Sequence, residues 1–327
     1  MKKVLLLLAL ISLLLTLSAW QVWKRYEAFL QVPLAIVPGG QVFQVEPGTT
    51  GTSIIRQLGS LGLTRSGWQW RLLMRLEPHV YLAGEYRLAE GIKPQELLAV
   101  LSGGQVVQYR ITLVEGWTFK QFAAALAANK DLRHEPDLDI DMAGFDIQHP
   151  EGWFLPETYV FTRGDSDRDI LVRAHEAMRA ALQESWESRA DSLPIETPYE
   201  LLILASIIEK ETSLDEERQQ IAGVFMRRLK KGMRLQTDPT VIYGLGDSYD
   251  GNIRRRDLQT DTPYNTYTRH GLPPTPIAMP GKASLVAAAN PASGETLYFV
   301  ADGKGGHTFS VTLEAHRRAV KKLVERN

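Results

Sequence analysis

The stretch TPYELLILASIIEKE, residues 197–211, decides how the C-terminal half of this chain folds. Thr197 is followed by Pro198, and Glu200 comes three residues after Thr197. This pattern is typical of a helix N-terminus, because the threonine caps the helix, the proline suits its first turn and the glutamate completes a capping box. Residues 201–208 are all apolar or small, so the spacing predicts a buried helix.

Two acids, Glu209 and Glu211, close this apolar run. Glu211 continues an aliphatic stripe, because it lies four and three residues beyond Ile207 and Ile208. A carboxyl group against aliphatic side chains loses hydration of its charged form, which raises its pKa and suits a general acid. The alternative is a solvated helix end in which Lys210 pairs with either glutamate.

The composition is that of a globular protein, with 44% hydrophobic residues in a chain of 327. That length allows about two domains plus an appendage. A net charge of -1 with scattered basic residues argues against a nucleic-acid partner. The chain has no cysteine, which excludes disulfides, thiolate metal sites and a cysteine nucleophile.

The N-terminal run VLLLLALISLLLTLSAW is long enough to span a bilayer as a helix. We expect residues 1–3 in the cytoplasm and a transmembrane anchor over residues 4–23, because Lys2 and Lys3 favour an inside N-terminus. The competing interpretation is a signal peptide cleaved after Ala19. Both interpretations export the rest of the protein.

Residues 24–40 are expected to form a linker, since glycine and proline gather toward its end. A strand, a Glu-Gly turn and an amphipathic helix then recur three times, with turns at Gly48, Gly91 and Gly116. Small modules of this kind look like LysM domains, which bind glycan chains, so we expect a LysM-like module over residues 41–108. The alternative is that such turns simply precede many helices.

Aromatic residues gather in HPEGWFLPETYVFTRG, residues 149–164, where Tyr159 is one of four and Glu151 and Glu157 are interleaved. Aromatic faces with nearby acids suit sugar rings, so Glu151 and Tyr159 are candidate substrate contacts. Taken alone, such a stretch is more often part of a core than of a ligand site.

Asp238 is the best candidate for the second carboxylate that standard glycosidases need. Asp238 followed by Pro239 is also a good helix cap, which is the interpretation we favour. Further on, Tyr264, Asn265 and Tyr267 precede a proline-stiffened loop. Their amide, hydroxyl and aromatic groups make a plausible edge for reading sugars.

The C-terminal stretch TLYFVADGKGGHTFSVTLEAH predicts a β-hairpin of residues 298–300 and 308–311, closed by a glycine-rich loop. The loop lacks the spacing of a phosphate-binding loop. His307 and His316 form a weak metal pair without third and fourth ligands. We expect both histidines to be structural or solvent-facing.

Four segments together resemble the MltG (YceG-like) family of endolytic murein transglycosylases, which are membrane-anchored bacterial enzymes: SIIEKET, RRLKKGMRLQTDPTVIYGLG, YNTYTRHGLPPTPIAMPG and LYFVADGKGGHTF. The resemblance runs from about residue 40 to residue 320, and it implies a YceG-like catalytic domain over residues 109–327. It implies that Glu211 is catalytic and that Thr212, which stands where better-known lytic transglycosylases have a serine, is a candidate substrate contact. The cleft residues that it implies are Gln236, Asp238, Tyr264, Asn265 and Tyr267.

The resemblance also implies a reaction that needs only one acid. Such enzymes cleave the β-1,4 bond between N-acetylmuramic acid and N-acetylglucosamine without water. One glutamate protonates the leaving oxygen and then takes the proton of the muramyl 6-hydroxyl, which closes on C1 as a 1,6-anhydro end. An intramolecular nucleophile replaces the work of a second carboxylate and has a large effective molarity.

We therefore expect an α+β protein with a transmembrane helix, a LysM-like strand-turn-helix module and a mixed α/β catalytic module. It would lie in the bacterial inner membrane with its body in the periplasm, without a metal or organic cofactor. It would cut nascent glycan strands and limit their elongation beside peptidoglycan synthases. The alternatives are a non-catalytic peptidoglycan-binding scaffold of the wall-synthesis machinery, and a muramidase using Glu211 and Asp238.

Overall fold

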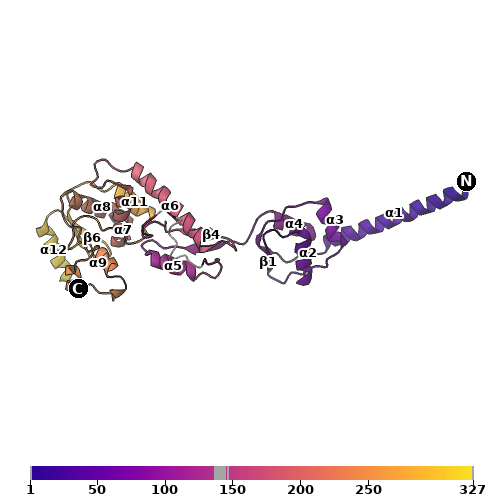
Figure 1. Ribbon diagram of the computed structural model, residues 1–327, viewed down its shortest axis with the longest axis horizontal. Helices are drawn as coiled ribbons and strands as arrows, with labels where there is room; N and C mark the ends of the chain where they lie inside the picture. The colour runs from indigo at the N-terminus through magenta and orange to yellow at the C-terminus, as the bar shows by residue number, and fades with distance from the viewer. Residues whose placement is uncertain (1, 136–144, 146, 326–327) are drawn as a thin grey trace. The chain divides into compact units, whose positions relative to one another are not determined.

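The computed structural model describes residues 2–135, 145 and 147–325. The chain divides into two compact units: unit 1 comprises Met1–Tyr109 with Thr162–Gly164, and unit 2 comprises Arg110–Phe161 with Asp165–Asn327. Each unit has its own cluster of buried apolar side chains. Helices and strands are both present, as the sequence predicts (Figure 1).

Unit 1 combines a long N-terminal helix with a small sheet and shorter helices. Its two strands pair antiparallel, with Gln41 opposite Leu88 and Val45 opposite Gly84. The shorter helices cover this sheet with a core that contains Ile54, among other side chains. The elements are α1 (Lys2–Gln31), β1 (Gln41–Val45), α2 (Gly51–Ser60), α3 (Trp68–Leu76), β2 (Gly84–Leu88) and α4 (Pro94–Ser102).

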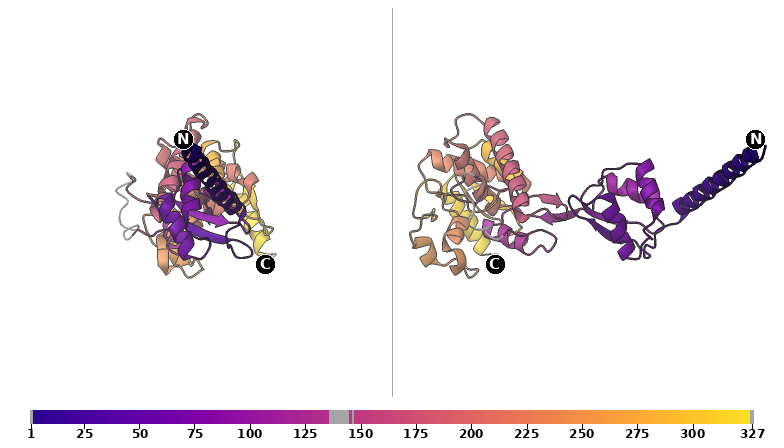
Figure 2. Two further views of the ribbon diagram at one scale, coloured as in Figure 1. Left: turned by 90° about the vertical axis from the view of Figure 1, so that its right-hand side faces the viewer. Right: turned by 45° about the vertical axis from the view of Figure 1, so that its right-hand side comes forward.

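Helix α1 is apolar and long enough to cross a membrane. It runs past the predicted anchor and continues to Gln31, so the first part of the predicted linker is helical (Figure 2). The physical reason is packing: Tyr26 is only 3% exposed, and the ring of Phe29 lies 5.1 Å from that of Trp70 in unit 1. Of the predicted cytoplasmic residues 1–3, Met1 lies outside the described residues.

The three predicted strand-turn-helix segments are confirmed. Their turn glycines Gly48, Gly91 and Gly116 have φ of +76°, +79° and +74°, a conformation that a β-carbon disfavours. Helix α2 follows the first turn and α4 the second. The third segment joins β3 (Tyr109–Thr112) to α5 (Phe119–Ala127), whose N-terminus is closed by a capping box at Thr118.

Within its described residues, unit 2 is a cluster of helices with two small two-stranded sheets. Strand β3 pairs with β4, and β5 pairs antiparallel with β6 as the predicted hairpin, with Tyr298 opposite Ser310. The remaining elements are β4 (Thr158–Phe161), α6 (Asp167–Glu187), α7 (Pro198–Glu211), α8 (Asp215–Lys230), α9 (Asp238–Leu245), η2 (Gly246–Ser248), α10 (Arg255–Gln259), α11 (Lys282–Ala289), β5 (Tyr298–Ala301), β6 (His307–Ser310) and α12 (Leu313–Val324).

Helix α7 begins where the sequence predicts. The hydroxyl of Thr197 accepts the backbone N–H of Glu200 at 3.2 Å, and the Glu200 carboxylate accepts the N–H of Thr197 at 3.3 Å. Pro198 occupies the first helical position, where its missing N–H is not needed. The capping box therefore fixes the start of the helix.

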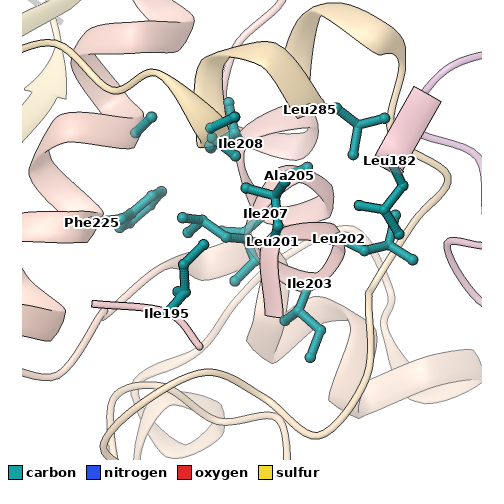
Figure 3. Close-up of a cluster of buried hydrophobic side chains, with 14 of the residues drawn as sticks. Leu182, Ile195, Leu201, Leu202, Ile203, Ala205, Ile207, Ile208, Phe225 and Leu285 are labelled. Carbon is teal, nitrogen blue, oxygen red and sulfur yellow. The ribbon is translucent and has the colours of Figure 1, made fainter. Parts of the chain in front are cut away.

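The eight residues of α7 from Leu201 to Ile208 are all buried. Their side chains meet those of α6, α8 and α11, and Figure 3 shows Leu182, Phe225 and Leu285 around them. Full burial of one such aliphatic side chain contributes roughly 1.5–3 kcal/mol. This packing holds the C-terminal end of α7, and hence Glu211, in a fixed position within unit 2.

Candidate active site

A cavity of about 420 Å³ lies in unit 2 at the end of α7, and Glu211 is in its wall. The wall is built from α8, the start of α9, the β5–β6 hairpin and α12. Its ionisable or hydroxyl-bearing members include Glu211, Arg228, Thr237, Asp238, Tyr267, Tyr298, His307 and His316. Segments far apart in the sequence therefore meet at one carboxyl group.

Glu211 is the carboxyl group whose environment fits proton transfer. Burial raises the pKa of Glu211 to about 7, and the nearby charge of Asp238 also raises this pKa. The hydroxyl of Thr237 donates to Oε1 of Glu211, which lowers the pKa, as do the charges of His307 and Arg228. Both forms of the carboxyl group are therefore populated near neutral pH, as an acid that later acts as a base requires.

Glu209 has a structural role on another face of α7. Its Oε2 accepts the backbone N–H of Gly281 at 3.0 Å and the hydroxyl of Ser284 at 2.7 Å. Two residues on a helix are about 200° apart, so Glu209 and Glu211 cannot face the same cavity. Glu209 thus fixes the start of α11. Of the two acids, Glu211 is the one whose side chain lines the cavity.

Asp238 lies in the cavity wall, but the predicted capping role is wrong. The N-cap of α9 is Thr237, and Asp238 is the first helical residue, without a side-chain capping bond. The hydroxyl of Tyr267 donates to Oδ1 of Asp238 at 2.5 Å. Tyr267 and Asp238 therefore lie together beside Glu211, as the predicted cleft requires.

Gln236 also lines the cavity, and its backbone is held in an unusual conformation. Its φ is +50°, a left-handed value that non-glycine residues rarely adopt. The N–H of Gln236 donates to the carbonyl of Thr266 at 3.2 Å, and the N–H of the next residue, Thr237, donates to the Thr266 hydroxyl at 3.1 Å. These bonds set the position of the Thr237 hydroxyl against Glu211.

Two predicted cleft residues, Tyr264 and Asn265, do not line the cavity. Asn265 is 1% exposed, and its amide N–H donates to the carbonyl of Thr260 at 2.7 Å. Its Oδ1 accepts the N–H of Tyr267 at 2.9 Å. The hydroxyl of Tyr264 lies 2.9 Å from that of Thr275. Asn265 therefore positions Tyr267, and it is not free to bind a sugar.

Thr212 is likewise outside the cavity wall. It ends α7, is 6% exposed, and its hydroxyl accepts the N–H of Leu214 at 3.1 Å. The hydroxyl also lies 3.4 Å from Oε2 of Glu217, to which it donates. Thr212 therefore joins the ends of α7 and α8, and the prediction of a substrate contact does not fit its burial.

Glu151 and Tyr159 are buried away from the cavity, so the core interpretation of their segment fits better. The carboxylate of Glu151 accepts the N–H of Phe119 at 2.9 Å and the hydroxyl of Tyr243 at 3.0 Å. Burial raises the pKa of Glu151 to about 7. The hydroxyl of Tyr159 donates to the carbonyl of Leu155 at 2.7 Å. Their polar atoms thus bond to protein groups.

The cavity wall also contains polar residues that the sequence did not indicate as site residues: Arg228, Thr237, Tyr298, His307 and His316. Arg228 is 7% exposed, donates to the carbonyl of Leu297 at 2.7 Å and lies 5.3 Å from the ring centroid of Tyr298. His307 and His316 both lie in the wall, although we expected them to be structural or solvent-facing. Among the described residues, no group of three or more His, Asp or Glu side chains has a metal-binding arrangement.

Several known proteins are similar to this chain. A model of the YceG-like family matches residues 43–322. The endolytic murein transglycosylase of Bacillus subtilis (strain 168) is 34% identical over 266 residues, which cover 75% of this chain and 73% of that protein. Its counterpart from Streptococcus pneumoniae (strain D39) is 27% identical over 329 residues, covering 88% of this chain but only 58% of that protein.

One solved structure is similar in fold. It is the crystal structure of a putative yceG-like protein from Listeria monocytogenes, with a TM-score of 0.52 and 28% sequence identity. The alignment covers 86% of this chain and 99% of that chain.

Proposed function

The chain belongs to the YceG-like family, and from this premise we propose that it is an endolytic lytic transglycosylase that cleaves peptidoglycan glycan strands. The observation that carries the proposal is Glu211, a carboxyl group with a pKa of about 7 at the wall of a cavity. A glycan strand placed in this cavity would meet one acid whose protonated form is populated at neutral pH.

The reaction uses Glu211 twice. Its proton passes to the glycosidic oxygen as the bond between C1 of N-acetylmuramic acid and that oxygen breaks. The muramyl 6-hydroxyl then bonds to C1, and its proton returns to the Glu211 carboxylate. The products are a 1,6-anhydro-muramyl end and a free 4-hydroxyl, and no water is consumed. The Thr237 hydroxyl, which donates to Oε1, orients the carboxyl group in both steps.

We also propose that residues 41–108 form a LysM-like module that binds glycan. Supporting this proposal, β1 and β2 form one antiparallel sheet, and α2 and α3 lie between them in the sequence. The proposed catalytic domain, residues 109–327, begins next to the boundary between units 1 and 2.

Helix α1 supports a single-pass anchor in the inner membrane, with the remaining chain in the periplasm. An anchored enzyme would act on strands close to the membrane, where nascent strands are made. We propose that it limits their elongation and works beside peptidoglycan synthases.

Substitution of the catalytic acid tests the proposal. The Glu211→Gln variant should bind glycan but lose roughly 10²- to 10⁴-fold in turnover, because the amide cannot deliver a proton. The matched control is Glu209→Gln, which changes an acid on the same helix that bonds to Gly281 and Ser284 outside the cavity. Turnover of Glu211→Gln within a few fold of the wild-type value would remove Glu211 from the mechanism.

The mass of the products tests the reaction type. Digestion of purified glycan strands should give anhydro-muramyl ends, measured by mass spectrometry. Ends heavier by one water would instead indicate a muramidase, in which Asp238 in the same cavity wall would activate the water. Wild-type binding without new chain ends would indicate a non-catalytic scaffold.

A further inference from the structure

His307, in the wall of the Glu211 cavity, is paired with a buried carboxylate, that of Glu217. Nδ1 of His307, at the start of β6, lies 2.7 Å from Oε2 of Glu217 on α8. The backbone N–H of His307 donates to Oε1 of the same carboxylate, also at 2.7 Å. Glu217 is 8% exposed. One buried carboxylate therefore holds both the ring and the backbone of His307, and bonds of this charged kind are stronger than neutral ones.

This pairing determines which edge of the imidazole ring is available. Nδ1 faces the carboxylate of Glu217. Because His307 also lines the cavity, the opposite edge of its ring, which carries Nε2, is the edge that can face the cavity. No hydrogen bond to Nε2 occurs among the residues that the structure describes. The rings of Phe299 and Phe309 pack against the imidazole at 5.3 Å and 6.4 Å and limit its rotation.

Several charged groups lie around Glu211, and some of them are already engaged in other hydrogen bonds. Asp238 on α9 raises the pKa of Glu211, while His307 and Arg228 lower it. The guanidinium of Arg228 already donates to the carbonyls of Leu297 and Leu235. On α7 itself, the side chains of Lys210 and Glu209 bond to Gly116, Gly281 and Ser284. The remaining titratable groups in the wall are Tyr267, Tyr298 and His316.

We propose that His307, oriented by Glu217, is the charge partner of Glu211 during the reaction. When Glu211 gives its proton to the glycosidic oxygen, a negative charge appears at the cavity wall, and the positive charge of the His307 ring stabilises it. When the proton of the 6-hydroxyl returns to Glu211, the starting charges are restored. His307 is a positioning and electrostatic residue, and this inference rests on the proposed function of Glu211.

Two variants of the full chain test the inference, with pH–rate profiles on purified glycan strands. His307→Asn keeps an amide near the place of Nδ1, which can still bond to Glu217, but has nothing in place of Nε2. Its kcat should fall by roughly 10²-fold, the lower end of what loss of one preorganised stabilising group costs in active sites. Without the cation the pKa of Glu211 rises, so the alkaline limb of kcat/KM should move to higher pH.

Glu217→Gln removes the carboxylate that holds the ring of His307 in its orientation. Its kcat should fall by a smaller factor than that of His307→Asn, and this variant decides the question if His307→Asn does not fold. The control is His270→Gln, an exposed histidine whose Nδ1 bonds only to the carbonyl of Gly232. It should keep the wild-type profile.

If His307 has a purely structural role, replacing it should change thermal stability without shifting the alkaline limb of kcat/KM. The inference is overturned if folded His307→Asn, or folded Glu217→Gln in its place, has the wild-type limb and a kcat within a few fold. An active Glu211→Gln enzyme would instead overturn the proposed function, so the two failures are distinguishable.

Discussion

Replacing Glu211 by glutamine should make the protein more stable at neutral and alkaline pH. The pKa of Glu211 is about 7 in the folded protein, against an ordinary value of 4.5 for a glutamate in water. Between these values the folded state holds a proton that the unfolded state has lost, so wild-type stability falls as the pH rises. The difference corresponds to about 3 kcal/mol above the folded pKa. Glutamine has no such dependence and can still accept the hydroxyl of Thr237.

The assay is thermal unfolding of unit 2 in the full-length wild-type and Glu211→Gln proteins over a series of pH values. For a folding unit of this size about 3 kcal/mol corresponds to roughly 5–10 °C in Tm. We expect that difference at alkaline pH, and we expect it to disappear below the pKa of an unfolded-chain glutamate, where both states are protonated. A difference in Tm that stays constant across this range would refute the burial of an ionisable carboxyl group. So would a wild-type protein that is the more stable of the two at alkaline pH.

Three further substitutions test the surroundings of the site. Asp238→Asn removes a negative neighbour, so the pKa of Glu211 should fall and the alkaline limb of kcat/KM should move to lower pH; an unmoved limb contradicts this. Thr237→Val removes the hydroxyl donor, so the limb should move to higher pH, and a shift in the other direction would be inconsistent with the hydrogen bond. Thr197→Ala removes the cap that accepts the N–H of Glu200 and should destabilise unit 2 by about 1 kcal/mol in urea unfolding, with the catalytic pH profile unchanged; unchanged stability would show the cap to be dispensable.

Local signals in the sequence predicted the elements well. The start of α7 follows from Thr197 and Pro198, whose chemistry acts within one helical turn. The positive φ of Gly48 and Gly91 could also be predicted from neighbouring residues, because the turn in which each glycine lies requires this conformation. The raised pKa of Glu211 agrees with one of the two interpretations that its position on an aliphatic helical stripe allowed, the other being a solvated helix end. Each of these signals lies within a few residues of the feature that it predicts.

The rest of the site depends on contacts that a local pattern does not contain. Glu217 and His307 lie 90 positions apart in the sequence, and Thr237 lies 26 positions from Glu211. His307 was therefore interpreted as structural. Asp238 was interpreted as a cap because Asp-Pro often begins a helix, although the helix begins one residue earlier at Thr237. Only the tertiary packing decides which polar groups face the cavity.

The buried end of α1 determines how far unit 1 can move from a lipid surface. Tyr26 lies three residues beyond Trp23, about 4.5 Å along a helix, and is already in the core of unit 1. A second attachment follows at Gln31, whose side chain accepts from Lys93 at 2.9 Å. With α1 in the bilayer as proposed, the membrane-spanning part of α1 continues directly into the core of unit 1, so unit 1 would lie at the level of the lipid headgroups. If the anchor and the glycan-binding role proposed above are correct, unit 1 would meet polysaccharide close to the lipid surface.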